Sequence, residues 1–100
     1  MTTADLSSTE EGCVLVTGPL VFASVVELLA KCEPFFADRE ELVFDFYEVN
    51  HTDSSGLALL LELLDRGSAQ GVSIRFRNMP SSLLGIARLS NAEQLLPVTG

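Results

Sequence analysis

The fold is decided by residues 42–77, which read LVFDFYEVNHTDSSGLALLLELLDRGSAQGVSIRFR. Residues 42–47 are dense in aromatic and β-branched side chains and too short for a typical helix, so we expect a central strand covered on both faces. Residues 57–65 have helical character, which we expect to end at one of the next two glycines. Residues 72–77 alternate between apolar and polar side chains, as in a strand with one polar face. The stretch therefore predicts a strand, a helix and a second strand.

Further elements flank this unit on both sides. Residues 13–17 are short, β-branched and stopped by Gly18-Pro19, which predicts another strand. The next apolar residues repeat at the spacing of one helical face, and we expect this helix to end before Pro34. Ser81-Ser82 are suited to cap a third helix, and residues 95–98 predict a last short strand or a docked tail. The predicted core-facing residues are Phe22, Val25, Val26 and Leu29 in the first helix, and Leu83, Ile86, Ala87 and Ser90 in the third.

The alternation of strands and helices predicts a single α/β domain around a small, mostly parallel sheet with right-handed crossovers. The chain has 100 residues, of which 47% are hydrophobic and 20% charged, so it has enough apolar material for one core. Residues 1–12 are polar and small, and we expect them to form a flexible N-terminal lead-in. The domain itself is expected to cover residues 13–98.

Charge and composition exclude several classes of partner. Fourteen acidic and six basic residues give a net charge of −8, which repels nucleic acids and anionic lipid surfaces. We find no stretch of about 18 consecutive apolar residues and no secretory signal at the start, so direct membrane insertion is not expected. Cys13 and Cys32 lack the spacing of a redox pair or a zinc site and are interpreted as buried free thiols. We therefore expect a cytoplasmic protein.

Motifs of catalysis are missing from the sequence. Neither a phosphate-binding loop nor a dinucleotide-binding glycine motif occurs, and the single histidine, His51, has no cysteines or histidines at metal-ligand spacing. Ser54, His51 and Asp53 are too close in sequence for a catalytic triad, whose base is reached across the fold. We expect a protein that is not an enzyme, with no catalytic residue, cofactor or metal.

Asp45 is the unusual residue of the first predicted strand. A carboxylate among apolar neighbours is costly to bury without hydrogen bonds. Asp45 must therefore find hydrogen-bond donors or face solvent at the end of the strand.

The informative segment is Asp53-Ser54-Ser55-Gly56, at the start of the predicted second helix. Aspartate and serine oxygens accept from the free amides of a first helical turn, and a glycine allows close backbone approach to a partner. A simple N-cap explains the same residues. At about 100° per residue, residues 57, 60, 61 and 64 share a core face, which places Leu59 and Leu63 on the opposite side beside Glu62 and Arg66.

Leucines on that opposite side indicate either a helix that neighbouring helices enclose or one that covers a partner. We favour a docking surface in which Leu59 and Leu63 are the apolar anchor. The predicted partner-binding residues are Asp53, Ser54, Ser55, Gly56, Leu59, Glu62, Leu63 and Arg66.

Residues 49–61, which read VNHTDSSGLALLL, resemble the signature of the STAS domain family, named for sulfate transporters and anti-sigma factor antagonists. The preceding Leu42-Val43-Phe44-Asp45 and the following Gly71-Val72-Ser73-Ile74 agree with the family's order of elements. The likeness covers about residues 13–98. It implies a small sheet, mixed at its edge and backed by helices, with the signature loop exposed.

Two branches of the family differ in what they imply. In the anti-sigma factor antagonists a kinase phosphorylates the first signature serine, which corresponds to Ser54 here. In the small STAS subunit of the ABC transporter that moves phospholipids in Gram-negative bacteria (the Mla system), the helix typically continues as residues 56–61 do here. We favour this second branch, which implies a non-catalytic subunit that maintains outer-membrane lipid asymmetry by stabilising the ATPase subunit, in a complex with the inner-membrane permease. The alternative partner is a serine kinase or anti-sigma factor.

Overall fold

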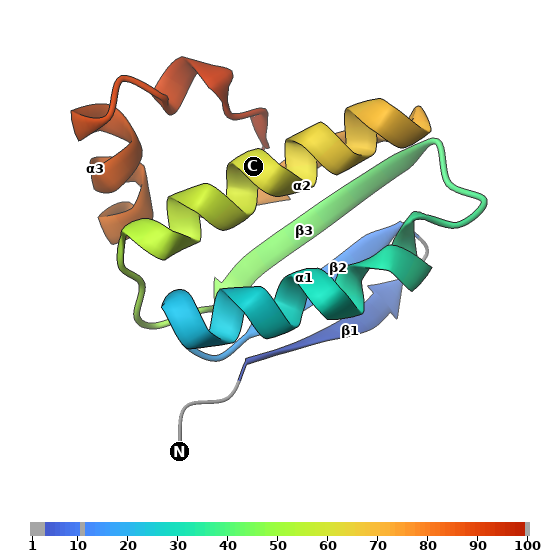
Figure 1. The fold of residues 1–100 in the computed structure, drawn as a ribbon, viewed down its shortest axis with the longest axis horizontal. Coiled ribbons are helices and arrows are strands. Elements are labelled where there is room, and N and C mark those ends of the chain that lie inside the picture. The colour runs from blue at the N-terminus through green and yellow to red at the C-terminus, as the bar shows by residue number, and fades with distance from the viewer. Residues whose placement is uncertain (1–3, 11, 100) are drawn as a thin grey trace.

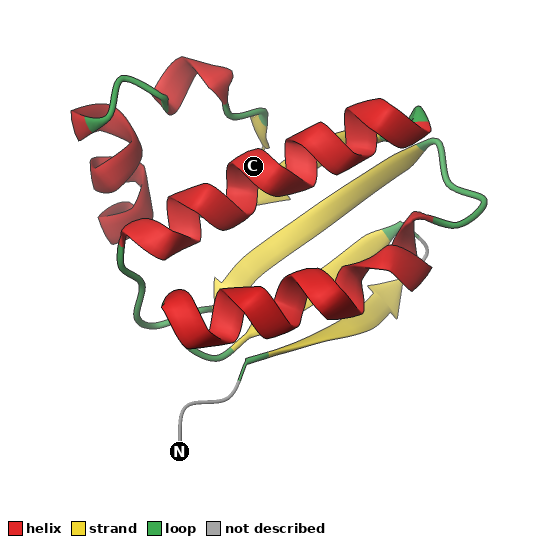
Figure 2. Cartoon of the chain, viewed as in Figure 1, coloured by secondary structure: helices red, strands yellow, loops and turns green. Residues whose placement is uncertain are grey.

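The structure of the chain is a computed structural model, and it describes residues 4–10 and 12–99. Strands and helices alternate over most of the chain (Figure 2). The elements are β1 (Asp5–Glu10), β2 (Cys13–Thr17), α1 (Phe22–Phe36), β3 (Glu41–Glu48), α2 (Ser54–Gln70), β4 (Ser73–Arg77), α3 (Ser81–Leu89), a short 3-10 helix η1 (Glu93–Leu95) and β5 (Val98–Thr99).

The five strands form one sheet in the order β1-β2-β3-β4-β5. The pairs β2–β3, β3–β4 and β4–β5 are parallel, while β1 pairs antiparallel with β2 at the edge. Parallel neighbours need a crossover connection, and α1, α2 and the α3–η1 segment supply the three crossovers. The predicted α/β domain with a mostly parallel sheet is confirmed.

The N-terminal segment is part of this sheet. Residues 5–10 pair with β2, and Leu6 lies opposite Val16 on the core side. The interpretation of residues 1–12 as a flexible lead-in is therefore wrong for 5–10, while residues 1–3 and 11 lie outside the described residues. An edge strand buries few side chains, so the sequence of β1 is polar. It lacks the alternation of apolar and polar residues from which a strand is predicted.

The two long helices lie side by side over one face of the sheet (Figure 1). On that face β3 buries Leu42, Phe44 and Phe46, whereas Asp45 and Tyr47 point to the other face, where Tyr47 is exposed. The expectation that this strand is covered on both faces is therefore wrong. The sheet instead has one covered face and one that is open among the described residues.

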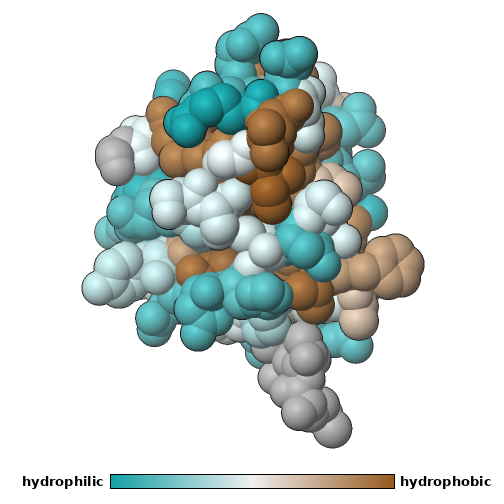
Figure 3. Space-filling model, turned by 90° about the vertical axis from the view of Figure 1, so that its left-hand side faces the viewer, coloured by the Kyte–Doolittle hydropathy of each residue, from teal (hydrophilic) through white to brown (hydrophobic). Residues whose placement is uncertain are grey.

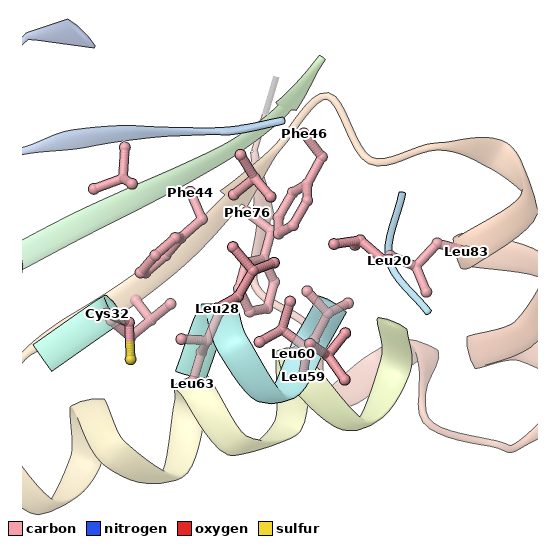
Figure 4. Close-up of a cluster of buried hydrophobic side chains, with 14 of the residues drawn as sticks. Leu20, Leu28, Cys32, Phe44, Phe46, Leu59, Leu60, Leu63, Phe76 and Leu83 are labelled. Carbon is pink, nitrogen blue, oxygen red and sulfur yellow. The ribbon is translucent and has the colours of Figure 1, made fainter. Parts of the chain in front are cut away.

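Aromatic side chains form the centre of the core between sheet and helices (Figure 4). Phe46 and Phe76 meet edge to face, with ring centroids 5.8 Å apart, and Phe36 lies 6.5 Å from Phe44. Burying Phe36 also explains why α1 runs through Pro34 to residue 36, beyond its predicted end, because this burial offsets the hydrogen bond that proline cannot donate.

The core face of α1 differs from the predicted one. Its buried residues are Ser24, Val25, Leu28, Cys32 and Phe36. Phe22 and Val26, predicted to face the core, are exposed, Phe22 by 73%. The buried Ser24 hydroxyl donates to the Pro19 carbonyl over 2.6 Å and accepts from the Val21 amide over 3.0 Å. This serine fixes the first turn, so Phe22 is held outward.

None of the helices within residues 4–10 and 12–99 combines the length and the apolar character needed to cross a membrane.

Candidate functional site

The signature segment connects β3 to α2 and caps that helix. Asp53 is the N-cap, and its Oδ1 accepts from the Ser55 amide over 2.8 Å. The Gly56 amide donates to the Asp53 carbonyl over 3.0 Å. Ser54 is the first residue of α2 and is exposed. The predicted cap is confirmed, and it leaves the Ser54 side chain at the surface beside the positive end of the helix dipole.

A second loop holds this segment in place. The Leu20 amide donates to the His51 carbonyl over 2.9 Å, and the Asp53 amide donates to the Leu20 carbonyl over 3.1 Å. The Thr52 hydroxyl donates to the same carbonyl over 3.3 Å, and the Leu20 side chain is fully buried. The start of α2 and the start of α1 are thereby joined into one unit.

Gly56 lies inside the fold rather than at the surface. A Cβ at this position would collide with the Thr52 hydroxyl oxygen and lie 3.2 Å from Leu83 Cδ1 of α3. Close backbone approach is indeed required here, but the neighbour is α3 of the same chain. Gly56 is therefore buried and cannot contact a partner as predicted.

The predicted apolar anchor is also wrong. Leu59 and Leu63 are each only 2% exposed, and they form one buried cluster with Leu60 and with Leu28 of α1 (Figure 4). Leu61, predicted to face the core, is 37% exposed instead. The helix α1 lies beside α2 on the side where Leu59 and Leu63 project, so the neighbouring helix covers them, which was the alternative explanation.

Glu62 and Arg66 are engaged inside the chain as well. The Arg66 guanidinium donates to Glu62 Oε2 over 3.0 Å, to the Leu29 carbonyl over 2.9 Å and to Glu33 Oε1 over 3.3 Å. It also lies 3.4 Å from the Cys32 sulfur. The Glu62 hydrogen bond raises the pKa of Arg66, while burial raises the pKa of the Cys32 thiol. Arg66 thus ties α2 to α1, and only a part of its side chain is left for a partner.

Exposed apolar residues that the sequence reasoning missed lie on α3 and on the first turn of α1, and both of these elements lie at the end of the molecule where α1 and α2 begin (Figure 1). Figure 3 faces this end, where brown apolar side chains appear among polar ones. Leu89 of α3 is 90% exposed and lines a shallow groove with Ser82, Gly85, Ile86 and Arg88. Phe22 projects from the first turn of α1. Leu89 directly follows Arg88 and does not share the helical face of the buried Leu83 and Ala87. This position on the helix is the sequence signal that predicts an outward-facing side chain.

The open face of the sheet holds a polar cluster around Asp45. Its carboxylate accepts from the Tyr47 amide over 2.9 Å, from Asn78 Nδ2 over 3.0 Å and from the Arg77 guanidinium over 3.2 Å. Burial raises the pKa of Asp45, but the hydrogen bonds from Asn78, Tyr47 and Arg77 outweigh it, so the pKa lies below its usual value. Arg77 also reaches the Cys13 sulfur over 3.0 Å. The predicted need of Asp45 for hydrogen-bond donors is confirmed.

Residues 4–10 and 12–99 contain no group of three or more His, Cys, Asp or Glu side chains that is arranged to hold a metal ion. Cys13 and Cys32 are both buried and free, as expected.

Comparison with solved structures shows the class of fold. The anti-sigma factor antagonist SpoIIAA in its unphosphorylated form superposes with a TM-score of 0.71 at 17% identity, over 97% of this chain and 88% of that one. The Bacillus cell fate determinant SpoIIAA in its phosphorylated form gives a TM-score of 0.68, also at 17% identity, over 97% of this chain and 91% of the other. No curated protein matches the sequence.

The family follows from the sequence match. The family model described as "Mlab, STAS domain" matches residues 4–97, and the chain therefore belongs to the MlaB-type STAS domain family. Such domains are in general non-catalytic and interact with partner proteins.

Proposed function

We propose that this protein is a non-catalytic subunit of an ABC transporter for phospholipids, which binds and stabilises the ATPase subunit on the cytoplasmic side of the inner membrane. The observation that carries the proposal is the match of residues 4–97 to the MlaB-type family. In this role the protein supports outer-membrane lipid asymmetry through a complex of the ATPase and the permease.

The docking surface lies at the end of the molecule where α1 and α2 begin. Ser54 is exposed there at the first position of α2, directly after a loop that is hydrogen-bonded to Leu20, so its position is set before a partner arrives. Preorganisation of this kind lowers the entropic cost of binding. Asp53 and Ser55 contribute through the cap that orients Ser54.

Because Leu59 and Leu63 are buried, the apolar anchor of the proposed interface lies on α3 and α1 instead. Leu89 and Ile86 line the shallow groove of α3, and Phe22 projects from α1. Exposed leucine and phenylalanine side chains gain most from burial when they fill a partner's pocket. Helix α3 and the first turns of α1 and α2 lie at the same end of the molecule (Figure 1), which supports a single interface.

The test is affinity purification with the ATPase subunit, comparing the wild type with Leu89→Asp. We expect at least about a tenfold loss of affinity, because a carboxylate replaces an apolar contact at the centre of the interface. The matched control is Leu95→Asp, which makes the same change at another exposed leucine outside the groove and should retain binding. Equal binding by the wild type and Leu89→Asp would contradict the site, and no binding by the wild type would contradict the function.

The alternative is a partner-switching antagonist in which Ser54 is phosphorylated. One observation favours it: the Ser54 side chain is exposed at the first position of α2, where the helix dipole tolerates a phosphate. The fold resembles that of SpoIIAA, which is known in unphosphorylated and phosphorylated forms. A phosphate beside Asp53 would change the charge of the docking surface while leaving the domain folded.

Mass spectrometry after incubation with a serine kinase of the anti-sigma type tests this alternative. If the protein is such an antagonist, the wild type gains one phosphate on Ser54 and a Ser54→Ala variant gains none. Failure of the wild type to accept phosphate at this position counts against the alternative.

A further inference from the structure

Basic side chains of this chain are all engaged within the molecule. The ion pairs join Lys31 to Asp5 (3.4 Å), Arg66 to Glu33 (3.3 Å), Arg75 to Glu41 (3.7 Å), Arg77 to Asp45 (3.2 Å) and Arg88 to Glu93 (2.9 Å). Arg39, the sixth basic residue, also has an interaction within the chain. The exposed pairs among them add little stability, but every pair cancels a positive charge locally.

Carboxylates at the proposed docking end are not compensated in this way. Glu27 lies in the second turn of α1, Glu48 ends β3 and Asp53 caps α2, and all three are exposed. Within residues 4–10 and 12–99, none of them has an ion-pair partner. Part of the net charge of −8 is thus carried by unpaired carboxylates at the end of the molecule where α1 and α2 begin and β3 finishes (Figure 1).

We infer that the partner's docking site is apolar at its centre and basic at its rim. The inference rests on the proposed function and names the chemistry of the partner's surface. Opposite charges at a rim steer association, and like charges placed together exclude wrong partners. A second copy of this chain would bring Glu27, Glu48 and Asp53 against the same three carboxylates. An anionic lipid surface would repel them too. The occupant that fits is a protein surface with arginine or lysine around a hydrophobic pocket.

The experiment measures the affinity of the ATPase subunit for the wild type and for Glu27→Gln, Glu48→Gln and Asp53→Asn at 50 mM and 300 mM salt. Asparagine is as good an N-cap as aspartate, so the last change removes charge and keeps the cap. We expect each neutralisation to weaken binding about two- to threefold at low salt, mainly by slowing association, and high salt to reduce the difference.

The matched controls are Asp38→Asn and Glu40→Gln. These exposed carboxylates also have no ion pair within the described part of the chain, and they lie in the connection between α1 and β3, at the far end of α1. Residue 27 is nine positions, or roughly 14 Å of helix, from the end of α1 at Phe36, and residues 38 and 40 lie beyond that end. This separation exceeds the Debye length of about 8 Å at physiological salt. We expect both controls to bind like the wild type. Equal losses at both ends, or binding that is insensitive to salt and to all five changes, would overturn the inference and leave the proposed function standing.

A second arm remains informative if the ATPase does not bind, which would contradict the proposed function. A synthetic amphipathic helical peptide with leucines flanked by lysines is titrated into the isotope-labelled protein, with a glutamate version as the control. We expect the lysine peptide to shift amide signals of Phe22, Ser54 and Leu89 and the glutamate peptide to leave them unchanged. Shifts confined to residues 38–41, or equal shifts with both peptides, would overturn the inference.

Discussion

The buried side of α2 and the first turn of the same helix differ in their surroundings: one lies in the core and the other is exposed. Along the buried side, Leu59, Leu60 and Leu63 are covered by the sheet and by α1. At the first turn, Asp53 caps the helix, and Ser54 is exposed directly after a loop that hydrogen bonds fix to Leu20. The comparison separates two roles: the leucine-rich sequence builds the core, and the short polar segment before it is exposed and belongs to the proposed docking surface.

The largest expected effect lies on the buried side. Leu63→Ala should lower the free energy of unfolding by about 2–5 kcal/mol, because it removes a fully enclosed side chain and leaves a cavity. Leu61→Ala, one-third exposed on the same helix, should cost less than about 1 kcal/mol. Urea denaturation of both variants provides the measurement. An equal loss in the free energy of unfolding for both variants would contradict the distinction between the two sides of α2.

Gly67 lies on the same buried side of α2, and a substitution there tests how closely the helix backbone approaches β4. A Cβ there would lie 2.5 Å from Ile74 Cγ1 and 2.7 Å from the Val72 carbonyl oxygen. Gly67→Ala should therefore destabilise the protein by about 1–3 kcal/mol, although alanine favours a helix interior by about 1 kcal/mol over glycine. Thermal unfolding measures this, and a raised melting temperature would contradict the close approach of α2 to β4.

Changes at the first turn should affect binding and leave the fold intact. Ser54→Asp places a negative charge where the dipole of α2 favours it, so stability should change by less than about 1 kcal/mol. Affinity for the ATPase subunit should fall about tenfold or more if Ser54 lies in the interface. Calorimetry and thermal unfolding of one sample separate the two quantities. A loss of stability equal to the loss of binding energy would show that the first turn is structural.

The smallest effect is the pH dependence that comes from Asp45. Its pKa is lowered in the fold, so its contribution to stability is present above the unfolded value of about 4 and is lost as the pH falls through the folded value. Asp45→Asn should flatten the acid side of the stability profile and leave ATPase binding unchanged, since Asp45 lies on the open face of the sheet. Acid titration followed by circular dichroism tests this, with Asp38→Asn as the exposed control. Identical acid profiles for Asp45→Asn and the wild type would contradict the role of the cluster.

Sequence reasoning predicted β2, β3, β4 and the capped start of α2, because alternation and capping are local properties. The predicted core faces of α1 and α2 were only partly correct: Val25, Leu57 and Leu60 are buried as predicted, whereas Phe22, Val26 and Leu61 are exposed. Leucines surround α2 on nearly every side, so only the position of α1 decides that Leu59 and Leu63 are inside. Strand β1 was missed because an edge strand needs only Leu6 to face the core. Asp53 and Ser54 form an exposed, capped turn as predicted, and their role in partner binding stays a prediction. The exposure of Phe22 and Leu89 could not be predicted, because it depends on packing between distant elements.

Hydrogen–deuterium exchange of this protein with and without the ATPase subunit tests the central claim most directly. The account predicts slower exchange in residues 53–58, at the start of α1 and in residues 82–89 on forming the complex, with β4 unchanged. Protection that falls instead on the open sheet face around Asp45 and Arg77 would contradict it.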